Sequence, residues 1–307
     1  MRNSQFPILN SQFSIFSTQE IAMNSIDNLK KAQILAEALP HIQKYDGKTI
    51  VVKYGGNAMV NEELKKAVMH DLVYLSTIGV KIVLVHGGGP EINRVLEKMN
   101  IESKFVDGLR VTDEDAIEVV QMVLAGKVNK DLVCHICNLG GHAIGLSGMD
   151  DSMLKCVPAD DVHGYVGNIT DVSTDVICEA LENNYIPVIS TVGFDENGHC
   201  YNINADTAAA EIAGALKAEA LISMTDIVGL CSDKDAPETL IQKVFISDTP
   251  ALIAQGIISG GMIPKIDSMT KALRQGCRKA FIIDGRVPHS ILMEMLTDEG
   301  MGTMFRL

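Results

Sequence analysis

The stretch from Thr49 to Met59, TIVVKYGGNAM, decides the fold class. It is apolar and rich in β-branched residues up to its end, where Lys53 and Tyr54 precede two glycines. A strand that is apolar throughout is typical of a parallel sheet covered on both faces. Ligands of such sheets bind beyond the carboxyl ends of the strands. We therefore expect Lys53 to face an anionic ligand.

Strand and helix patterns alternate along the rest of the chain. Apolar residues recur at helical spacing near 61–78, 90–99 and 113–138, and the polar stretch 157–175 is typical of a hairpin. Further apolar strand patterns are KIVLVH, HAIGLSG, YIPVIST, ALISMTD and KAFIIDG. This alternation predicts an α/β fold with a mainly parallel central sheet between two layers of helices, a three-layer αβα sandwich.

The composition excludes several classes of function. The chain has 307 residues, of which 47% are hydrophobic, enough to fill the core of one large α/β unit or of two fused lobes. A net charge of -13 and a pI near 5.0 argue against binding to nucleic acid or to an acidic membrane surface. No run approaches the ~20 apolar residues of a membrane span. These features predict a soluble globular protein without nucleic-acid or membrane partners.

The cysteines predict a reducing compartment. Seven of them are scattered along the chain, an odd number, and no pattern of a secretory signal accompanies them. We therefore expect reduced thiols and a cytoplasmic location. Cys134 and Cys137 have a spacing found in metal sites, but no second pair follows at zinc-finger distance. We expect no metal site built from protein side chains.

The first residues do not resemble part of a folded domain. Residues 3–9, NSQFPIL, are followed by the near-repeat NSQFSIF, which is typical of read-through from repetitive DNA upstream of a gene. We expect residues 1–22 to be disordered or a mis-assigned start, with Met23 as the true first residue. We predict a helix over residues 23–46, because apolar residues recur at helical spacing from 25 to 45. Pro40 should kink this helix.

Two glycine clusters follow consecutive predicted strands. They are Gly55-Gly56 and the run that begins with Gly87-Gly88. Glycine lets the backbone approach a ligand closely and point N–H groups at anionic oxygens, and a helix N-terminus behind it favours negative charge. Neither cluster has the spacing of a P-loop or of a dinucleotide-binding turn. The alternative is a tight turn between strand and helix, and Lys53 beside the first pair favours an anion site.

Three other segments carry polar residues that a helix start alone does not need. Asn202 and Asp206 lie in NINADTAAAEIA, where one capping side chain would suffice. Lys265 follows a Gly-Gly pair in SGGMIPKID, although a lysine near a turn is ordinarily solvated. Arg110 in GLRVTD precedes a helix and is suited to holding a carboxylate through two hydrogen bonds.

In combination, these segments resemble the N-acetylglutamate kinase family of the amino acid kinase superfamily. The matching pieces extend from about residue 30 to residue 304 and include VVKYGGNAM, LVHGGGPEIN, GLRVTD, EVVQMVLAGKVNKDLV, YNINADTAAAEIA, SGGMIPKIDSM and HSILMEMLTDEGMGTM. The resemblance implies the amino acid kinase fold and transfer of the γ-phosphoryl group of ATP to the γ-carboxylate of N-acetyl-L-glutamate, the second step of arginine biosynthesis. It implies an acetylglutamate-binding lobe over 47–200 and an ATP-binding lobe with a C-terminal regulatory segment over 201–307.

The resemblance also implies roles for the residues singled out above. Lys53 and Lys265 would neutralise the phosphoryl group in transfer, and Asp206 would hold both ammonium groups in place. Mg²⁺ would arrive with ATP and be bound largely through the phosphates. Gly55 and Gly56 would contact the ATP phosphates, and Gly87 and Gly88 would contact both phosphate and the acyl substrate. Arg110 would pair with the α-carboxylate of that substrate, and Asn202 would bind its acetylated amino group.

Regulation by L-arginine is a further implication of the resemblance. The N-terminal helix resembles the extension by which arginine-inhibited members interlace dimers into a hexamer, a trimer of dimers, the alternative being that it packs on its own subunit. Glu294 and Gly300 stand where those enzymes hold arginine. Two departures are His41, where the family often has tyrosine, and Ala220, where it often has lysine. A PII-type regulatory protein is another partner that the resemblance raises.

Two alternative functions stay open. A kinase for an N-blocked α-aminoadipate, one methylene longer, would differ in the depth of the pocket behind Arg110. A catalytically silent arginine-sensing subunit would not need Lys53, Asp206 and Lys265, whose presence argues against it. Carbamate, aspartate and uridylate kinases share the fold, but NINADTAAAEIA together with GLRVTD speaks against them. An NAD-dependent oxidoreductase would need a glycine spacing that is absent here.

Overall fold

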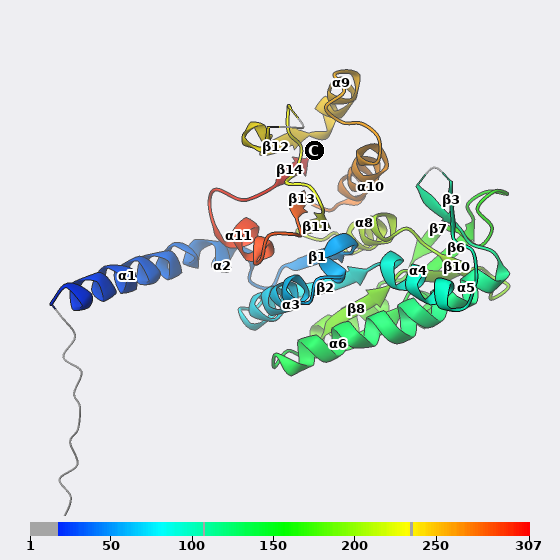
Figure 1. Cartoon of the computed structure of the whole chain (residues 1–307), viewed down its shortest axis with the longest axis horizontal. Helices are drawn as coiled ribbons and strands as arrows, with labels where there is room; N and C mark the ends of the chain where they lie inside the picture. The colour runs from blue at the N-terminus through cyan, green and yellow to red at the C-terminus, as the bar shows by residue number, and fades with distance from the viewer. Residues whose placement is uncertain (1–17, 107, 234–235) are drawn as a thin grey trace, which may run out of the picture.

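A single eight-stranded sheet runs through the molecule (Figure 1). The computed structural model describes residues 18–106, 108–233 and 236–307, with the backbone alone for 18–27 and for residue 57. The strand order is β12-β14-β13-β11-β1-β2-β8-β5. Every neighbouring pair is parallel except β13 with β14. The strands are β1 (Thr49–Tyr54), β2 (Lys81–His86), β5 (Ala143–Ser147), β8 (Ile186–Ser190), β11 (Ala220–Thr225), β12 (Lys243–Phe245), β13 (Ala280–Asp284) and β14 (Thr303–Arg306).

Helices cover both faces of this sheet, so the predicted three-layer sandwich is confirmed. Alternate residues of β1 enter different cores: Ile50 and Val52 pack on one side and Val51 on the other. The first core is closed by α3 (Glu62–Thr77), α4 (Gly89–Lys98), α5 (Glu114–Gln121), α6 (Asn129–Asn138) and α11 (Ser290–Leu296). The second is closed by α7 (Asp175–Glu182), α8 (Ala205–Ala215) and α10 (Met262–Gln275). Because both faces are buried, the strands read as continuous apolar runs.

The predicted helix over 113–138 is present but changes its winding. Between α5 and α6 lies η2 (Met122–Val128), a π-helical segment. Such segments are frequent at functional sites, because the extra residue in the turn shifts the side chains that follow. The other short helices are η1 (Gly56–Met59), η3 (Asp150–Ser152), η4 (Pro237–Thr239), η5 (Ile246–Asp248) and α9 (Thr249–Ala254).

A second, smaller sheet covers one end of the molecule and contains the predicted hairpin. Its order is β10-β9-β6-β7, and β6 (Leu154–Pro158) pairs antiparallel with β7 (Gly167–Val172). Its remaining strands are β9 (Val192–Phe194) and β10 (Cys200–Asn202). A separate hairpin is formed by β3 (Lys104–Val106) and β4 (Leu109–Val111). Apart from the β6–β7 hairpin, none of these short strands was expected from the sequence.

The N-terminal helix α1 (Thr18–Glu37) projects from the body, and α2 (Leu39–Tyr45) connects it to the body (Figure 1). α1 begins earlier than the predicted start at residue 23 and is followed by α2, in whose first turn Pro40 lies. The predicted kink is therefore confirmed. The expectation of disorder or a mis-assigned start falls on residues 1–17, which lie outside the described part of the chain, and on 18–22, which are helical.

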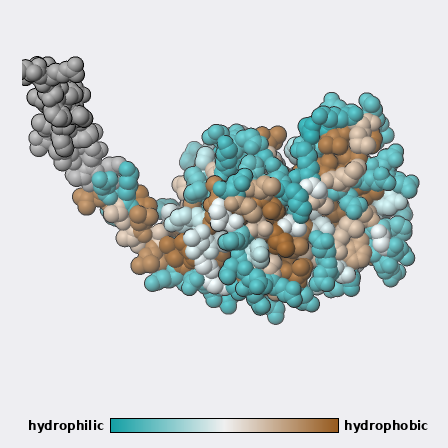
Figure 2. Space-filling view, turned by 90° about the horizontal axis from the view of Figure 1, so that it is seen from below, coloured by the Kyte–Doolittle hydropathy of each residue, from teal (hydrophilic) through white to brown (hydrophobic). Residues whose placement is uncertain are grey.

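The projecting helix carries uncovered apolar side chains. Leu29, Ile34 and Leu35 are 70%, 63% and 67% exposed, and Figure 2 shows the apolar surface along this arm. A helix of this kind seldom keeps its apolar stripe in water, because large apolar patches mark contact surfaces. The described monomer leaves this stripe without a covering element.

The cysteines and the membrane expectation can be compared directly with the structure. All seven cysteines are free, and Cys134 and Cys137 are exposed. Over the described ranges, only His70, Asp71 and His289 approach one another closely enough to form a metal-ligand group, so the C-x-x-C pair has none of the additional ligands that zinc needs. No described helix combines the length and apolarity that crossing a membrane requires.

Candidate active site

Lys53, Asp206 and Lys265 come together at the carboxyl ends of the central strands. Lys53 is on β1, Asp206 in the first turn of α8 and Lys265 in the first turn of α10. The Lys53 ammonium lies 3.3 Å from Oδ1 of Asp206, and that of Lys265 lies 2.5 Å from Oδ2. Ser223 on β11 donates a hydrogen bond of 3.0 Å to Oδ1. The asparagine at position 204 caps α8, so Asp206 is left to bind side chains.

The surroundings of this triad favour a bound anion. Lys53 is only 9% exposed. Burial lowers its pKa below the ordinary lysine value, and the carboxylate of Asp206 partly offsets this. Burial alone would raise the pKa of Asp206, but the two ammonium groups outweigh it and the pKa falls below the ordinary value. With one carboxylate between two cations, the charged cluster carries an excess positive charge at the edge of a cavity.

The first glycine pair forms a turn in which Gly56 adopts a left-handed backbone conformation that favours glycine. Gly56 has a φ of +69°, and a Cβ at this position would lie 3.3 Å from the carboxylate of Asp226. A Cβ on Gly55 would lie 3.4 Å from the Lys53 ammonium. A hydrogen bond holds this turn in place: the buried Tyr54 hydroxyl donates to the carbonyl of Ala58 at 2.7 Å. The backbone of the turn therefore lies directly beside the Lys53 ammonium.

The predicted substrate residues line one cavity, and two of the predicted catalytic residues line a second cavity that adjoins it. Gly87, Gly88, Arg110 and Asn202 lie around one of about 170 Å³. Asp206 and Lys265 line the next, of about 440 Å³. Gly108, Leu109, Val166 and Asn204 belong to both. Segments separated by more than half of the chain therefore converge on one cleft.

Arg110 is a buried cation without a carboxylate partner. It is 6% exposed, stacks on the Phe105 ring at 4.7 Å and donates a hydrogen bond of 2.5 Å to the Asn93 side chain and another to the hydroxyl of Ser103. Burial lowers the pKa of its guanidinium. In the part of the chain that the structure describes, no carboxylate lies within ion-pair distance of it. A buried guanidinium is costly unless an anion pairs with it, so the cavity is suited to a ligand carboxylate.

The second glycine cluster differs in one respect from the expectation. The N–H of Gly87 already donates a hydrogen bond of 3.0 Å to the carbonyl of Tyr54. Gly88 precedes α4, and we find no acceptor for its N–H among the described residues. A Cβ on Gly88 would come within 2.6 Å of the Leu124 side chain, so a larger residue would fit only if Leu124 moved. One N–H of the predicted pair is thus left for a ligand.

Asn202 lies beside Arg110 on the wall of the smaller cavity. It is the last residue of β10, is half-buried and donates a weak hydrogen bond of 3.4 Å to the hydroxyl of Thr112. Its amide lines the same cavity as Arg110. The hydrogen-bonding capacity that remains on this amide is available to a polar group of a ligand.

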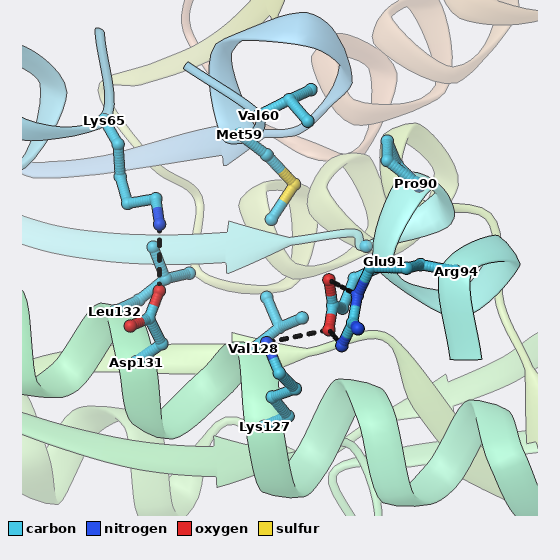
Figure 3. Close-up of a pocket in the computed structure, with 11 residues that line it drawn as sticks. Met59, Val60, Lys65, Pro90, Glu91, Arg94, Lys127, Val128, Asp131 and Leu132 are labelled. Atoms are coloured by element: carbon cyan, nitrogen blue, oxygen red, sulfur yellow. Dashed lines mark hydrogen bonds and ion pairs between the residues drawn. The ribbon is translucent and has the colours of Figure 1, made fainter. Parts of the chain in front are cut away.

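A third cavity, of about 140 Å³, is also lined by Gly88, and Figure 3 shows the charged side chains on its wall. Its charged side chains pair with one another. Glu91 accepts from Arg94 at 2.5 Å and from Lys127 at 2.7 Å, and Lys65 lies 3.0 Å from Asp131. Glu91 thereby ties the first turn of α4 to η2. This cluster was not predicted from the sequence, because its members lie on four separate helical segments, α3, α4, η2 and α6.

Glu294 and Gly300 are neighbours, as predicted, on the wall of a cavity of about 310 Å³ at the base of the N-terminal helices. A Cβ on Gly300 would lie 3.1 Å from the Glu294 carboxylate. That carboxylate accepts backbone hydrogen bonds of 2.7 and 2.9 Å from residues 301 and 302, while burial raises its pKa. Ala220 is fully buried in β11, and Lys279 lines the cavity instead. His41 also lines it, 3.3 Å from Asp298.

Comparisons with known proteins agree with this geometry. The family model described as the amino acid kinase family matches residues 48–284. The acetylglutamate kinase of Brachyspira hyodysenteriae is 55% identical over 92% of this chain and 99% of its own length. That of Clostridioides difficile is 53% identical over 91% and 98%. Among solved structures, N-acetylglutamate synthase from Neisseria gonorrhoeae, complexed with coenzyme A and N-acetyl-glutamate, has a TM-score of 0.79 at 25% identity, covering 90% of this chain and 63% of that one.

A sheet of this topology, with two lysines and an aspartate at its carboxyl edge, defines a phosphotransferase of the amino acid kinase class. The chain belongs to the amino acid kinase family and, within it, to the acetylglutamate kinases.

Proposed function

We propose that Lys53, Asp206 and Lys265 carry out the reaction of the acetylglutamate kinases in this chain. The chain transfers the γ-phosphoryl group of ATP to the γ-carboxylate of N-acetyl-L-glutamate, a step of arginine biosynthesis. The observation that carries the assignment of residues is the two ammonium groups held on one carboxylate, 3.3 and 2.5 Å away, beside the cavity of Arg110.

The two lysines act on the phosphoryl group from opposite sides. Lys53 comes from β1 and Lys265 from α10, so the moving group passes between charges that are already in place. Such a transfer spreads negative charge over the phosphoryl oxygens, and preorganised cations stabilise it without forming a covalent intermediate. Asp206 positions both cations. The N–H groups of Gly55 and Gly56 bind the ATP phosphates beside Lys53.

The site fits a magnesium ion that is carried by ATP. Both carboxylate oxygens of Asp206 already bind Lys53, Lys265 and Ser223, so this residue has little capacity left for an ion. Mg²⁺ retains several waters and binds mainly through substrate phosphates. Its contribution is to neutralise phosphate charge. The turn at Gly55 and Gly56 would hold the phosphates that carry it.

The acyl substrate is oriented by the smaller cavity. Arg110 pairs with the α-carboxylate, which supplies the anion that this buried guanidinium lacks. Asn202 binds the acetylated amino group, and the N–H of Gly88 binds the γ-carboxylate that accepts the phosphoryl group. The three contacts fix both ends of a five-carbon diacid, so the distance between Arg110 and Gly88 selects the length of the substrate.

A coupled assay of ADP formation tests this function. With ATP and Mg²⁺, we expect turnover of N-acetyl-L-glutamate, and a kcat/KM for N-acetyl-α-aminoadipate lower by about tenfold to two-hundredfold, the range that one methylene is worth. A higher kcat/KM for the longer acid would make the chain an aminoadipate kinase. Absence of turnover with both acids, in protein shown to be folded by circular dichroism, would favour a silent sensing subunit.

Feedback by L-arginine is the second part of the proposal. The cavity beside Glu294 offers a buried carboxylate for a guanidinium, and Gly300 allows close approach of the backbone. Lys279, which lies 3.5 Å from Glu219, supplies the cation that Ala220 does not. The wall also includes His41 of α2, so arginine there would contact the N-terminal helices.

The uncovered stripe of α1 fits assembly into a homohexamer, a trimer of dimers. Its exposed leucines and isoleucine would be buried against α1 of a second copy, and arginine bound at the base of the arm would then act on the assembly. A PII-type protein is a further proposed partner. We also propose a cytoplasmic location, in line with seven free cysteines.

Arginine should raise the half-saturating concentration of acetylglutamate. In protein of known mass by light scattering, we expect millimolar arginine to raise it by about fivefold or more, the lower end of ordinary allosteric coupling. Glu294→Gln should abolish this shift and retain turnover without arginine, because the guanidinium loses its charged partner. The matched control, Glu196→Gln on an exposed turn, should keep the shift. An unchanged saturation curve in wild type would remove arginine as an effector.

A further inference from the structure

His86 and Asn129 form a buried polar pair directly beneath the second glycine cluster. His86 ends β2, Asn129 begins α6, and both are fully buried. None of the roles assigned above uses either side chain. Buried polar groups are expensive unless they hydrogen-bond in a defined way, so the contacts of this pair can be followed one by one.

Two backbone carbonyls fix which way the Asn129 amide faces. Its Nδ2 lies 2.7 Å from the carbonyl oxygen of Val188 and 3.0 Å from that of Leu146. The opposite orientation would bring Oδ1 against both carbonyl oxygens, which are acceptors only. The side of Asn129 that faces His86 is therefore the NH₂ group, 3.1 Å from Nε2 of the ring.

The Asn129 amide in turn fixes the tautomer of His86. A proton on Nε2 would point at the Asn129 NH₂ group, which cannot accept a hydrogen bond, so Nε2 carries no proton. The proton of a neutral imidazole then sits on Nδ1, which lies 2.9 Å from the carbonyl oxygen of Gly87 and donates to it. Burial lowers the pKa of His86 to about 4, so the ring is neutral near pH 7.

The peptide between Gly87 and Gly88 is oriented by this hydrogen bond. The structure has no cis peptide bond over the described residues, so the C=O of Gly87 and the N–H of Gly88 point in opposite directions. With the carbonyl held toward the buried ring, the N–H points away from it, and Gly88 lines both the substrate cavity and the cavity of Glu91. The N–H of Gly87 is held separately by Tyr54.

We infer that His86, held as its Nδ1–H tautomer by Asn129, is a positioning residue that aims the N–H of Gly88 at the acceptor carboxylate of acetylglutamate. This inference rests on the role proposed above for Gly88. Gly145 belongs to the same arrangement, because a Cβ there would collide with Oδ1 of Asn129. The chain of contacts extends from β5 and β8 through Asn129 and His86 to the glycine turn.

Two amide substitutions separate the contacts of the ring. Asparagine places its NH₂ group where Nδ1 stands, so His86→Asn should keep the donor to Gly87. Glutamine places its amide where Nε2 stands, so His86→Gln should keep a partner for Asn129 and lose that donor. We expect His86→Gln to raise KM for acetylglutamate by about tenfold to a hundredfold, the range for a hydrogen bond to a charged group, with KM for ATP unchanged. His86→Asn should restore most of this loss.

The ring itself can be observed without any substitution. In the full chain labelled with ¹⁵N-histidine, magic-angle-spinning NMR should show one neutral imidazole with the proton on Nδ1 from pH 6 to 8, and His86→Asn should remove that signal. A proton on Nε2 would overturn the inference. So would equal KM values for acetylglutamate in the two amide variants. Failure of wild type to phosphorylate acetylglutamate would refute the proposed function and leave the tautomer measurement standing.

Discussion

Lys265→Ala lowers kcat for acetylglutamate phosphorylation by about a hundredfold or more, the scale of losing one preorganised contact to developing charge. The ammonium is held 2.5 Å from Asp206 and reaches the cleft from the first turn of α10, so no other side chain on that helix can replace it. KM for acetylglutamate should change little, because the residues proposed to bind that substrate lie around the other cavity. Lys53→Ala should cause a loss of the same order.

Lys271→Ala is the matched control, since this lysine lies on the same helix with its side chain 56% exposed and pairs with Glu211 away from the cleft. It should retain normal kcat. Steady-state kinetics with both substrates varied, together with thermal unfolding of each variant, would separate loss of catalysis from loss of fold. Near-normal turnover of folded Lys265→Ala would remove this lysine from the mechanism.

The parts of the fold that the sequence predicted are those governed by local pattern. The run TIVVKY is buried on both faces, so every position is apolar or carries a functional group, and its bounds coincide with β1. Lys53 stood out because a charged side chain at the end of such a strand needs a specific partner. Arg110 was identified by a different argument, its position before a helix and its ability to hold a carboxylate through two hydrogen bonds. The structure leaves that guanidinium without a carboxylate, and it lines a cavity.

The parts that the sequence could not predict depend on register and on contacts between distant segments. Ser223 binds Asp206 because β11 pairs with β1 so that Ser223 lies beside Lys53, and nothing in either strand alone sets that register. Gly87 was expected to offer its N–H to a ligand, but the end of β1 lies close enough for the carbonyl of Tyr54 to accept it. A glycine pair indicates that a backbone is accessible, and only the tertiary contacts determine which N–H remains.

Asp206→Asn should have the larger effect, a fall in kcat of about a thousandfold, because one substitution disturbs both cations. The neutral amide leaves two ammonium groups close together in a buried site, where like charges repel strongly. Burial already lowers the pKa of Lys53, and the carboxylate of Asp206 is the strongest influence that raises it. Removing that charge lowers the pKa of Lys53 further.

The lower pKa of Lys53 in Asp206→Asn sets the direction in which the pH profile of kcat moves. The protonated form of Lys53 is the active one, so the alkaline fall in kcat should move to lower pH in Asp206→Asn than in wild type. Asp175→Asn, which removes an exposed carboxylate from the first turn of α7, is the control and should leave the profile in place. Profiles of kcat from pH 6 to 10 would decide the matter. If the alkaline fall in kcat stays at the same pH or moves to higher pH, Asp206 does not keep Lys53 protonated. Another group would then have to hold Lys53 and Lys265 in place.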